Sequence, residues 1–167
     1  MNYLGLSKEQ VAPTGKALNQ LLANYHIYYQ NLRNFHWNIT GEDFFDLHNQ
    51  FEELYEDARE KIDEIAERIL TLRLRPMSQL TDYLKISEAE EYGVVIDAHE
   101  MVEKLLENHR IIIASMRKVI SEADEISDEG TIDMTGGMLS SFEKSSWMLD
   151  AWYQKTKKTT PAQASNN

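Results

Sequence analysis

Apolar residues recur every three or four positions along four long segments, and no segment shows the apolar–polar alternation of a strand. This spacing predicts helices, because it gathers the apolar side chains on one face. The four stripes are Leu18, Leu21, Tyr25, Tyr28, Leu32 and Phe35; then Phe44, Leu47, Phe51, Leu54, Ala58, Ile62, Ile65 and Ile69; then Ala98, Val102, Leu105, His109, Ile112, Met116, Val119, Ala123 and Ile126; and finally Met134, Met138, Phe142, Ser145, Leu149 and Trp152. The chain is therefore predicted to be all-α.

Signals for the helix ends accompany these stripes. Pro13 is tolerated near the start of the first helix. Thr40 followed by Asp43 approximates a capping box for the second helix. Asp97 and Glu100 are expected to cap the start of the third helix.

The lengths of the connections indicate how the helices are arranged. Short links near 38–41 and 127–130 predict two antiparallel hairpins. The intervening segment 71–95 contains Pro76 and a short predicted helix over 78–84. Fully extended, it reaches about 80 Å, well beyond the roughly 42 Å of the second helix. The sequence thus predicts a four-helix bundle with a long crossover of the ferritin-like kind, between the second and third helices.

The chain length fits one domain, which we expect to span residues 1–154. Residues 155–167 show no apolar periodicity and are expected to form a disordered tail. This tail holds Lys155, Lys157 and Lys158, the most basic local stretch of the chain.

Composition narrows the classes of function. The chain has 28 acidic and 17 basic residues, a net charge of -11, and no cysteine. This charge opposes binding to a polyanion and favours cations, and thiolate metal sites are excluded. No apolar run approaches a membrane span, and residues 1–10 carry no signal-peptide pattern, so we expect a cytoplasmic protein without membrane contact.

Two histidines and three carboxylates have the spacing of a divided metal site. His48 and Glu52 are four residues apart, as are Asp63 and Glu67, so each pair projects from one helix face. Glu52 and Asp63, however, are separated by roughly 16 Å of helix rise, too far for one ion. A second copy of the helix, antiparallel across a two-fold axis, would bring the two halves together. With His36, the set predicts an intersubunit site for iron, zinc or manganese.

Two sequence blocks carry a resemblance to a known family. The first is His36-Trp-Asn-Ile-Thr-Gly41, followed by Leu47-His48 and Glu52, and the second is Ile62-Asp-Glu-Ile-Ala-Glu-Arg68. Over essentially its whole length the chain resembles the Dps family, the DNA-protecting mini-ferritins of starved bacteria. The resemblance implies a hollow shell of twelve four-helix bundles, with ferroxidase sites at two-fold interfaces and an iron oxide core.

Carried over to this chain, the resemblance assigns His36, His48 and Glu52 to one subunit. It assigns Asp63 and Glu67 to the two-fold mate, with Glu67 binding or bridging iron and Asp63 binding metal or orienting ligands. All five are the predicted catalytic and iron ligands.

Two positions depart from the family pattern. Glu52 stands where the family usually has Asp, so its longer arm is expected to alter the geometry or occupancy of the metal. Arg73 replaces the small or turn-forming residue expected after the second helix.

Other residues have alternative interpretations. His26, His99 and His109 are interpreted as structural, and none of the five histidines follows the Glu-x-x-His pattern of a site inside one bundle. Trp37 is either core filling or a neighbour of the iron site that packs the ligands or quenches radicals.

Acidic residues outside the predicted site also have two interpretations each. One group is either a solvated helix face or a mineral-nucleating surface: Glu53, Glu56, Asp57, Glu60 and Glu64. The resemblance places Asp128 and Asp133 at three-fold pores, whereas helix capping is the alternative for Asp128.

We therefore expect a ferroxidase and iron-storage protein that oxidises Fe(II) and mineralises Fe(III) in a homododecamer, protecting against oxidative damage. The resemblance suggests hydrogen peroxide rather than oxygen as the oxidant. One alternative is a DNA-binding, nucleoid-compacting protein with little iron chemistry. Lys8, Lys16 and the three tail lysines offer few phosphate contacts, so weak DNA binding at most is expected. Another alternative is a helical assembly with a structural zinc site.

Overall fold

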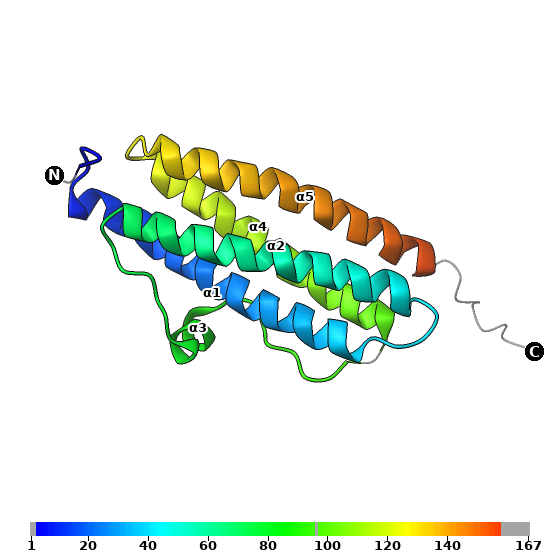
Figure 1. Cartoon of the computed structure of the whole chain (residues 1–167). Helices are drawn as coiled ribbons and strands as arrows, with labels where there is room; N and C mark the ends of the chain where they lie inside the picture. The colour runs from blue at the N-terminus through cyan, green and yellow to red at the C-terminus, as the bar shows by residue number, and fades with distance from the viewer. Residues whose placement is uncertain (1–2, 96, 158–167) are drawn as a thin grey trace, which may run out of the picture.

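The computed structural model describes residues 3–95 and 97–157, and within them it contains five helices and no strand. Helix α1 (Lys8–Asn38) and helix α2 (Phe44–Thr71) form one antiparallel hairpin, and α4 (Ala98–Asp124) and α5 (Glu129–Lys157) form the other (Figure 1). The short helix α3 (Leu80–Ile86) lies in the crossover, two residues later than predicted. The predicted all-α bundle with a long crossover is confirmed.

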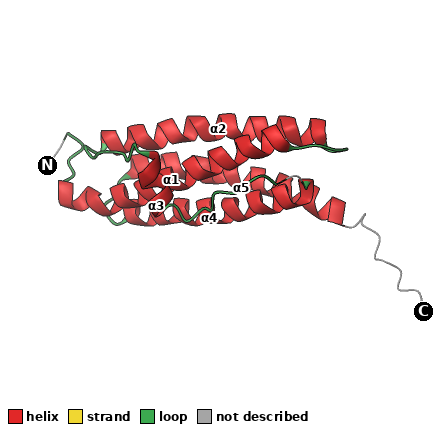
Figure 2. Ribbon diagram, turned by 90° about the horizontal axis from the view of Figure 1, so that it is seen from below, coloured by secondary structure: helices red, strands yellow, loops and turns green. Residues whose placement is uncertain are grey.

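The crossover runs along the outside of the bundle. It places α3 against α1, while the four long helices lie alongside one another (Figures 1 and 2). Within residues 3–95 and 97–157, no helix combines the length and apolarity that crossing a bilayer requires. Helix α5 continues to Lys157, three residues beyond the predicted domain boundary at residue 154. The remainder of the predicted tail, residues 158–167, lies outside the described residues.

Local side-chain chemistry sets the start of α1 and of α4. The Gln10 amide donates to Ser7 Oγ (3.3 Å) while the Ser7 amide donates to Gln10 Oε1 (2.8 Å), a capping box that we did not predict. Pro13 is therefore the sixth residue of α1, deeper than expected. For α4 the prediction is confirmed, because the Glu100 amide donates to Asp97 Oδ1 (2.9 Å).

The predicted capping box of the second helix is wrong. Helix α2 begins at Phe44, and the side chain of its N-cap residue, Asp43, makes no capping hydrogen bond. Thr40 precedes this N-cap by three residues and so lies outside the capping position. The chain instead turns at Gly41, whose φ of 94° suits glycine, and the Phe44 amide donates to the Gly41 carbonyl (3.2 Å).

Helix α2 ends at Thr71, and two residues later Arg73 adopts a left-handed conformation with φ of 64°. The Leu74 amide donates to the Ile69 carbonyl (3.1 Å), which satisfies part of the last turn. The Arg73 guanidinium lies 4.7 Å from the centre of the Tyr3 ring, and the Tyr3 hydroxyl donates to the Thr71 carbonyl (2.6 Å). The turn therefore forms with arginine, and Tyr3 covers it.

The four predicted stripes converge on a single core. Most of their members are buried, and the largest fully buried side chains include Tyr25, Tyr28, Phe35 and Phe51. The rings of Tyr25 and Tyr28 each meet Phe142 edge to face, at 5.9 and 5.6 Å between centroids. Aromatic contacts of this kind join α1 to α5 across the bundle.

His109 is a core histidine, as interpreted from the sequence. Its Nε2 lies 2.7 Å from the Tyr28 hydroxyl, and its Nδ1 lies 2.8 Å from Ser146 Oγ. Because the Ser146 hydroxyl donates to the Phe142 carbonyl (2.8 Å), it accepts from Nδ1, and Nε2 accepts from Tyr28. Complete burial lowers the pKa of His109 from 6.5 to about 3. The ring is therefore neutral in the folded protein at physiological pH.

A row of asparagines on α1 fixes the crossover. The row comprises Asn19, Asn24, Asn31 and Asn34. Each makes hydrogen bonds to the backbone of the crossover. Asn19 Oδ1 accepts from the Met77 amide (2.7 Å), and Asn34 Nδ2 donates to the carbonyls of Tyr92 (3.0 Å) and Gly93 (2.9 Å). These polar residues thus provide the partners that an extended segment without regular secondary structure needs.

The two buried members of the row connect the crossover to α4 as well. Asn24 accepts from the Glu88 amide (2.8 Å) and donates to Ser115 Oγ (2.8 Å). Asn31 accepts from the Tyr92 amide (3.0 Å) and donates to the Glu90 carbonyl (2.8 Å) and to Asn108 (2.9 Å). The crossover, α1 and α4 therefore share one polar network.

Replacing Asn31 by alanine is expected to destabilise the protein by about 2–4 kcal/mol, because it leaves donors and acceptors on the crossover and on α4 without their partner. Asn49→Ala is the matched control, since Asn49 is exposed on α2, and it should change stability by less than about 0.5 kcal/mol. Urea unfolding at fixed protein concentration measures both. Equal midpoints for the two variants would contradict a structural role for the network.

His109 is expected to make stability fall as the solution is acidified. The unfolded imidazole binds a proton near pH 6.5, whereas the folded one does so only near pH 3. The contribution is therefore complete above pH 6.5 and is lost towards pH 3, with a slope of up to about 1.4 kcal/mol per pH unit. Urea unfolding between pH 7 and pH 5 should show a shallower dependence for His109→Gln than for the unmodified protein. Identical slopes would contradict this prediction.

Candidate metal centre

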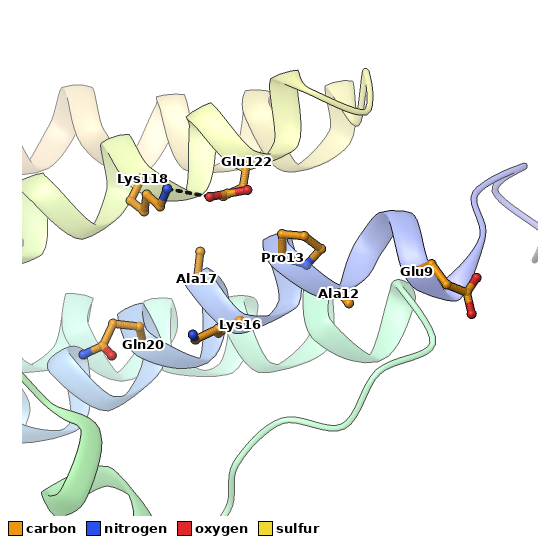
Figure 3. Close-up of a pocket in the computed structure, with 8 residues that line it drawn as sticks. All are labelled: Glu9, Ala12, Pro13, Lys16, Ala17, Gln20, Lys118 and Glu122. Carbon is orange, nitrogen blue, oxygen red and sulfur yellow. Dashed lines mark ion pairs between the residues drawn. The ribbon is translucent and has the colours of Figure 1, made fainter.

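A groove of about 670 Å³ lies between α1 and α4 (Figure 3). It is lined by Glu9, Ala12, Pro13, Lys16, Ala17, Gln20, Lys118 and Glu122. Lys118 and Glu122 pair with each other (2.5 Å), and the lining combines small apolar groups with both signs of charge. Its described lining contains no histidine, so the predicted donor set does not lie there.

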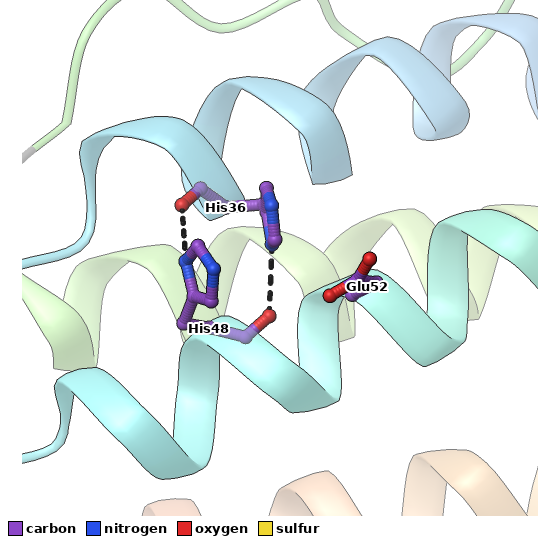
Figure 4. Close-up of side chains that lie close together, drawn as sticks. All are labelled: His36, His48 and Glu52. Carbon is purple, nitrogen blue, oxygen red and sulfur yellow. Dashed lines mark hydrogen bonds between the residues drawn. The ribbon is translucent and has the colours of Figure 1, made fainter.

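The corner between α1 and α2 brings together His36, His48 and Glu52 (Figure 4). One ligand atom from each lies within 4.8 Å of the other two. Two ligand atoms about 2.1 Å from a shared ion can be at most about 4.2 Å apart. The three side chains therefore need only a small inward movement to bind one ion.

Two reciprocal hydrogen bonds fix the histidines. His36 Nδ1 lies 2.9 Å from the His48 carbonyl, and His48 Nδ1 lies 3.0 Å from the His36 carbonyl. A carbonyl oxygen only accepts, so each Nδ1 carries a proton, and in the neutral form of each ring Nε2 keeps the lone pair that can bind a metal ion. The rings are stacked at 3.8 Å between centroids and 22° between planes. Backbone carbonyls thus hold both imidazoles in the tautomer that a metal site needs.

The solvent exposure of the three side chains increases from His36 to Glu52. His36 is 9% exposed, His48 is partly buried, and Glu52 is exposed. The Phe44 ring stacks on His48 at 4.8 Å. The imidazoles are therefore packed against protein on one side, while the carboxylate end of the cluster opens to solvent.

Tyr55 is a neighbour of the cluster that the sequence analysis missed. Its hydroxyl donates to Glu52 Oε1 (3.3 Å), and its ring meets His36 edge to face at 5.3 Å. Partial burial, followed by the charge of Glu52, raises the pKa of Tyr55, which keeps its hydroxyl a donor. The spacing of three residues from Glu52 on a helix was the available signal.

Asp63 and Glu67 lie elsewhere on α2. Both are exposed, and they line a cavity of about 600 Å³ together with Arg59, Glu60, Ile62 and Glu64. Because α2 is continuous from Phe44 to Thr71, the roughly 16 Å of rise between Glu52 and Asp63 remains. Within the described chain the structure does not bring these two carboxylates to the histidines.

The other histidines, which the sequence analysis interprets as structural, lie beside aromatic rings. His26 stacks on Tyr83 at 4.0 Å, and burial lowers the pKa of His26. His99 lies beside Trp152, 5.3 Å between ring centroids. Among the described residues, His36, His48 and Glu52 are the group of ligand-type side chains close enough to share an ion.

Trp37 does not fill the core. Its side chain is 60% exposed, and the Arg33 guanidinium lies 4.8 Å from its ring centre. The core-filling interpretation is therefore wrong. Its position directly after His36 leaves the other interpretation, a neighbour of the metal site, as a prediction.

Asp128 caps α5. It is 5% exposed, accepts from the amide and hydroxyl of Thr131, and pairs with the Arg68 guanidinium (2.5 Å). The capping interpretation of Asp128 is thus confirmed, and its carboxylate is already engaged. Asp133 is exposed, and its assignment to a pore stays a prediction.

The remaining acidic residues of α2 lie on its surface. Arg59 pairs with Glu56 (2.8 Å) and Lys61 lies 3.6 Å from Glu64. Burial, the largest influence, raises the pKa of Asp57. This is a partly neutralised solvated face, and a role in mineral nucleation stays a prediction.

Comparison with known proteins agrees with this architecture. The family model of the ferritin-like domain matches residues 15–159. The DNA protection during starvation protein of Porphyromonas gingivalis is 44% identical over 155 residues, covering 93% of this chain and 98% of that protein. DNA protection during starvation protein 2 of Bacillus anthracis is 36% identical over 137 residues, covering 82% and 94%.

Solved structures of Dps proteins are also similar to this chain. The crystal structure of a Dps protein from Vibrio cholerae O1, described as a member of a broad superfamily of ferritin-like diiron-carboxylate proteins, has a TM-score of 0.89. It is 43% identical, with 91% of this chain and 96% of that chain covered. Dps from Listeria innocua soaked with zinc has a TM-score of 0.80 and 29% identity, with 83% and 94% covered.

Proposed function

Because the chain belongs to the Dps family of ferritin-like proteins, we propose that it is a ferroxidase that oxidises Fe(II) and stores the product as an Fe(III) mineral. Iron is the substrate, and hydrogen peroxide is the electron acceptor. A twelve-subunit shell encloses the mineral. The result is protection from oxidative damage, since both reactants of hydroxyl-radical chemistry are consumed.

The observation that carries this proposal is the tautomer of the two histidines. The reciprocal bonds of His36 and His48 leave both Nε2 atoms as ligands, with the Glu52 carboxylate beside them. Two imidazoles and one carboxylate with open positions suit a non-haem Fe(II) site. Three protein ligands leave coordination positions for the oxidant and for further carboxylates.

We assign the further carboxylates to Asp63 and Glu67 of a second copy of the chain. The length of α2 separates them from Glu52 within one chain, and both are exposed on its surface. A two-fold axis that places two α2 helices antiparallel would juxtapose each half with the other copy's complementary half, giving two equivalent sites.

An exposed apolar face close to the site supports such a contact. On α3, Leu80 is 73% exposed and Leu84 is 54% exposed. They border a cavity of about 350 Å³ that Tyr29 and Arg33 of α1 also line, and the Tyr29 ring packs on Tyr55. Exposed leucines that continue toward a half-site are suited to burial against another subunit.

The chemistry balances with peroxide as a two-electron acceptor. Two Fe(II) ions each lose one electron, and H₂O₂ with two protons becomes two molecules of water. Carboxylate oxygens stabilise the harder Fe(III), so the protein contributes ligand geometry and electrostatics to chemistry that belongs to the metal. Fe(III) then hydrolyses, releases protons to solvent and deposits as an oxide.

Removing both imidazoles is expected to slow Fe(II) oxidation. His36→Ala combined with His48→Ala deletes two of three ligands in the half-site, and loss even of outer partners of metal ligands costs about 10–100-fold. His99→Ala is the control, because His99 lies beside Trp152, outside the cluster. The absorbance of Fe(III) after anaerobic Fe(II) loading and peroxide addition gives the rate, and light scattering gives the particle size. An assembled double variant with an unchanged rate would disprove the assignment.

Mixing two inactive variants tests whether the site is shared between subunits. His48→Ala removes a ligand from one half, and Glu67→Gln removes one from the other half. In a mixed pair one site carries both lesions and the other carries neither, so equal mixing should restore about a quarter of the sites.

The two variants are produced together with different affinity tags, and doubly tagged shells are assayed for Fe(II) oxidation. Wild-type shells that carry both tags are the control for handling. Mixed shells as inactive as either parent, beside active wild-type shells, would rule out a site shared between subunits.

A further inference from the structure

Glu52 is the least constrained ligand of the proposed half-site. It is exposed, and a glutamate carboxylate reaches its ligand position through three rotatable bonds, so an unrestrained side chain would sample many orientations. Among the described residues, its hydrogen-bond donor is the Tyr55 hydroxyl, 3.3 Å from Oε1. Tyr55 thus restricts a ligand that the backbone leaves free.

Tyr55 is itself held in place by α1. Its ring meets His36 edge to face at 5.3 Å and 87°, and it meets Tyr29 at 6.1 Å and 83°. The Arg33 guanidinium lies 5.2 Å from the centre of the Tyr29 ring. Two ring contacts from a neighbouring helix fix the plane of Tyr55 and therefore the position of its hydroxyl.

We infer that Tyr55 is a positioning residue, whose hydroxyl occupies one oxygen of the Glu52 carboxylate and directs the other oxygen towards the ion held by His36 and His48. The inference rests on the proposed function, since it concerns the same half-site. An oxygen that accepts this hydrogen bond is a weaker ligand for the ion, which favours binding through the other oxygen and restricts how many coordination positions Glu52 occupies.

The length of Glu52 makes this contact specific to a glutamate at position 52. Shortening the side chain to aspartate withdraws the carboxylate by one methylene. Because the hydroxyl distance is already 3.3 Å, withdrawal takes the oxygen beyond hydrogen-bond range. Tyr55 therefore acts on the metal site in the presence of Glu52 and not in the presence of aspartate.

Tyr55→Phe tests the inference, because it keeps both ring contacts and removes only the hydroxyl. Anaerobic titration with Co(II) should show a half-saturation concentration about tenfold higher. The visible absorption of the bound Co(II) should also change, since the coordination geometry changes. Tyr153→Phe is the matched control: its hydroxyl donates to Glu103 (3.0 Å), a tyrosine–glutamate contact between α5 and α4. That variant should bind Co(II) as the unmodified protein does.

A double-mutant cycle with Glu52→Asp separates positioning from a general loss of packing. In the Glu52→Asp background, Tyr55→Phe should alter Co(II) half-saturation by less than about twofold, because the two changes remove the same interaction. The same loss in both backgrounds, or no loss with Glu52 present, would overturn the inference.

The His48→Ala variant distinguishes this failure from failure of the proposed function. If Co(II) binding and its spectrum are the same with and without His48, the half-site does not hold a metal and both conclusions fall. If binding depends on His48 but not on the Tyr55 hydroxyl, only the role of Tyr55 is overturned.

Discussion

The arrangement of this chain depends on the hydrogen bonds that buried asparagine side chains of α1 make to the backbone of the crossover. An extended crossover has no helix or sheet to provide hydrogen bonds for its backbone, and leaving such groups unpaired costs about 1–3 kcal/mol each. Asn24 and Asn31 supply those partners and connect the same segment to α4. The crossover is therefore held along one face of the bundle, with α3 against α1. That position places the exposed leucines of α3 next to Tyr29, whose ring packs on Tyr55 beside the candidate site.

Much of the fold was predictable because the buried residues recur along the sequence with the period of a helix. Every member of the first stripe, from Leu18 to Phe35, is buried. The asparagine row was not predicted, since a polar residue between apolar ones is ordinarily solvated, and its partners in the crossover and α4 are 58 or more residues away in the chain. The ends of the helices were less predictable. Ser7 and Gln10 carried a recognisable capping signal that was missed, whereas Thr40 and Asp43 carried the signal without forming the box.

The candidate site, too, was predictable from the sequence only in part. Helical spacing identified His48 with Glu52, and the family motif added His36, because these relations are local in sequence. The tautomer of the histidines was not predictable, since it depends on which carbonyl faces each Nδ1 across the hairpin. Asp128 illustrates the converse. Its cap was foreseen as one of two interpretations, but the pairing with Arg68, 60 residues earlier, emerges only from the packing of α2 against the start of α5.

The reciprocal histidine bonds also tie the end of α1 to the start of α2. They span residues 39–43, the link between α1 and α2, and each ring holds the backbone of the opposite helix. An ion that binds both Nε2 atoms would close the same link from the other side. By mass action, such an ion stabilises the closed corner by RT ln(1 + [L]/Kd). Binding of an ion at this corner would therefore be coupled to the stability of the link between α1 and α2, which would be greatest with the ion bound.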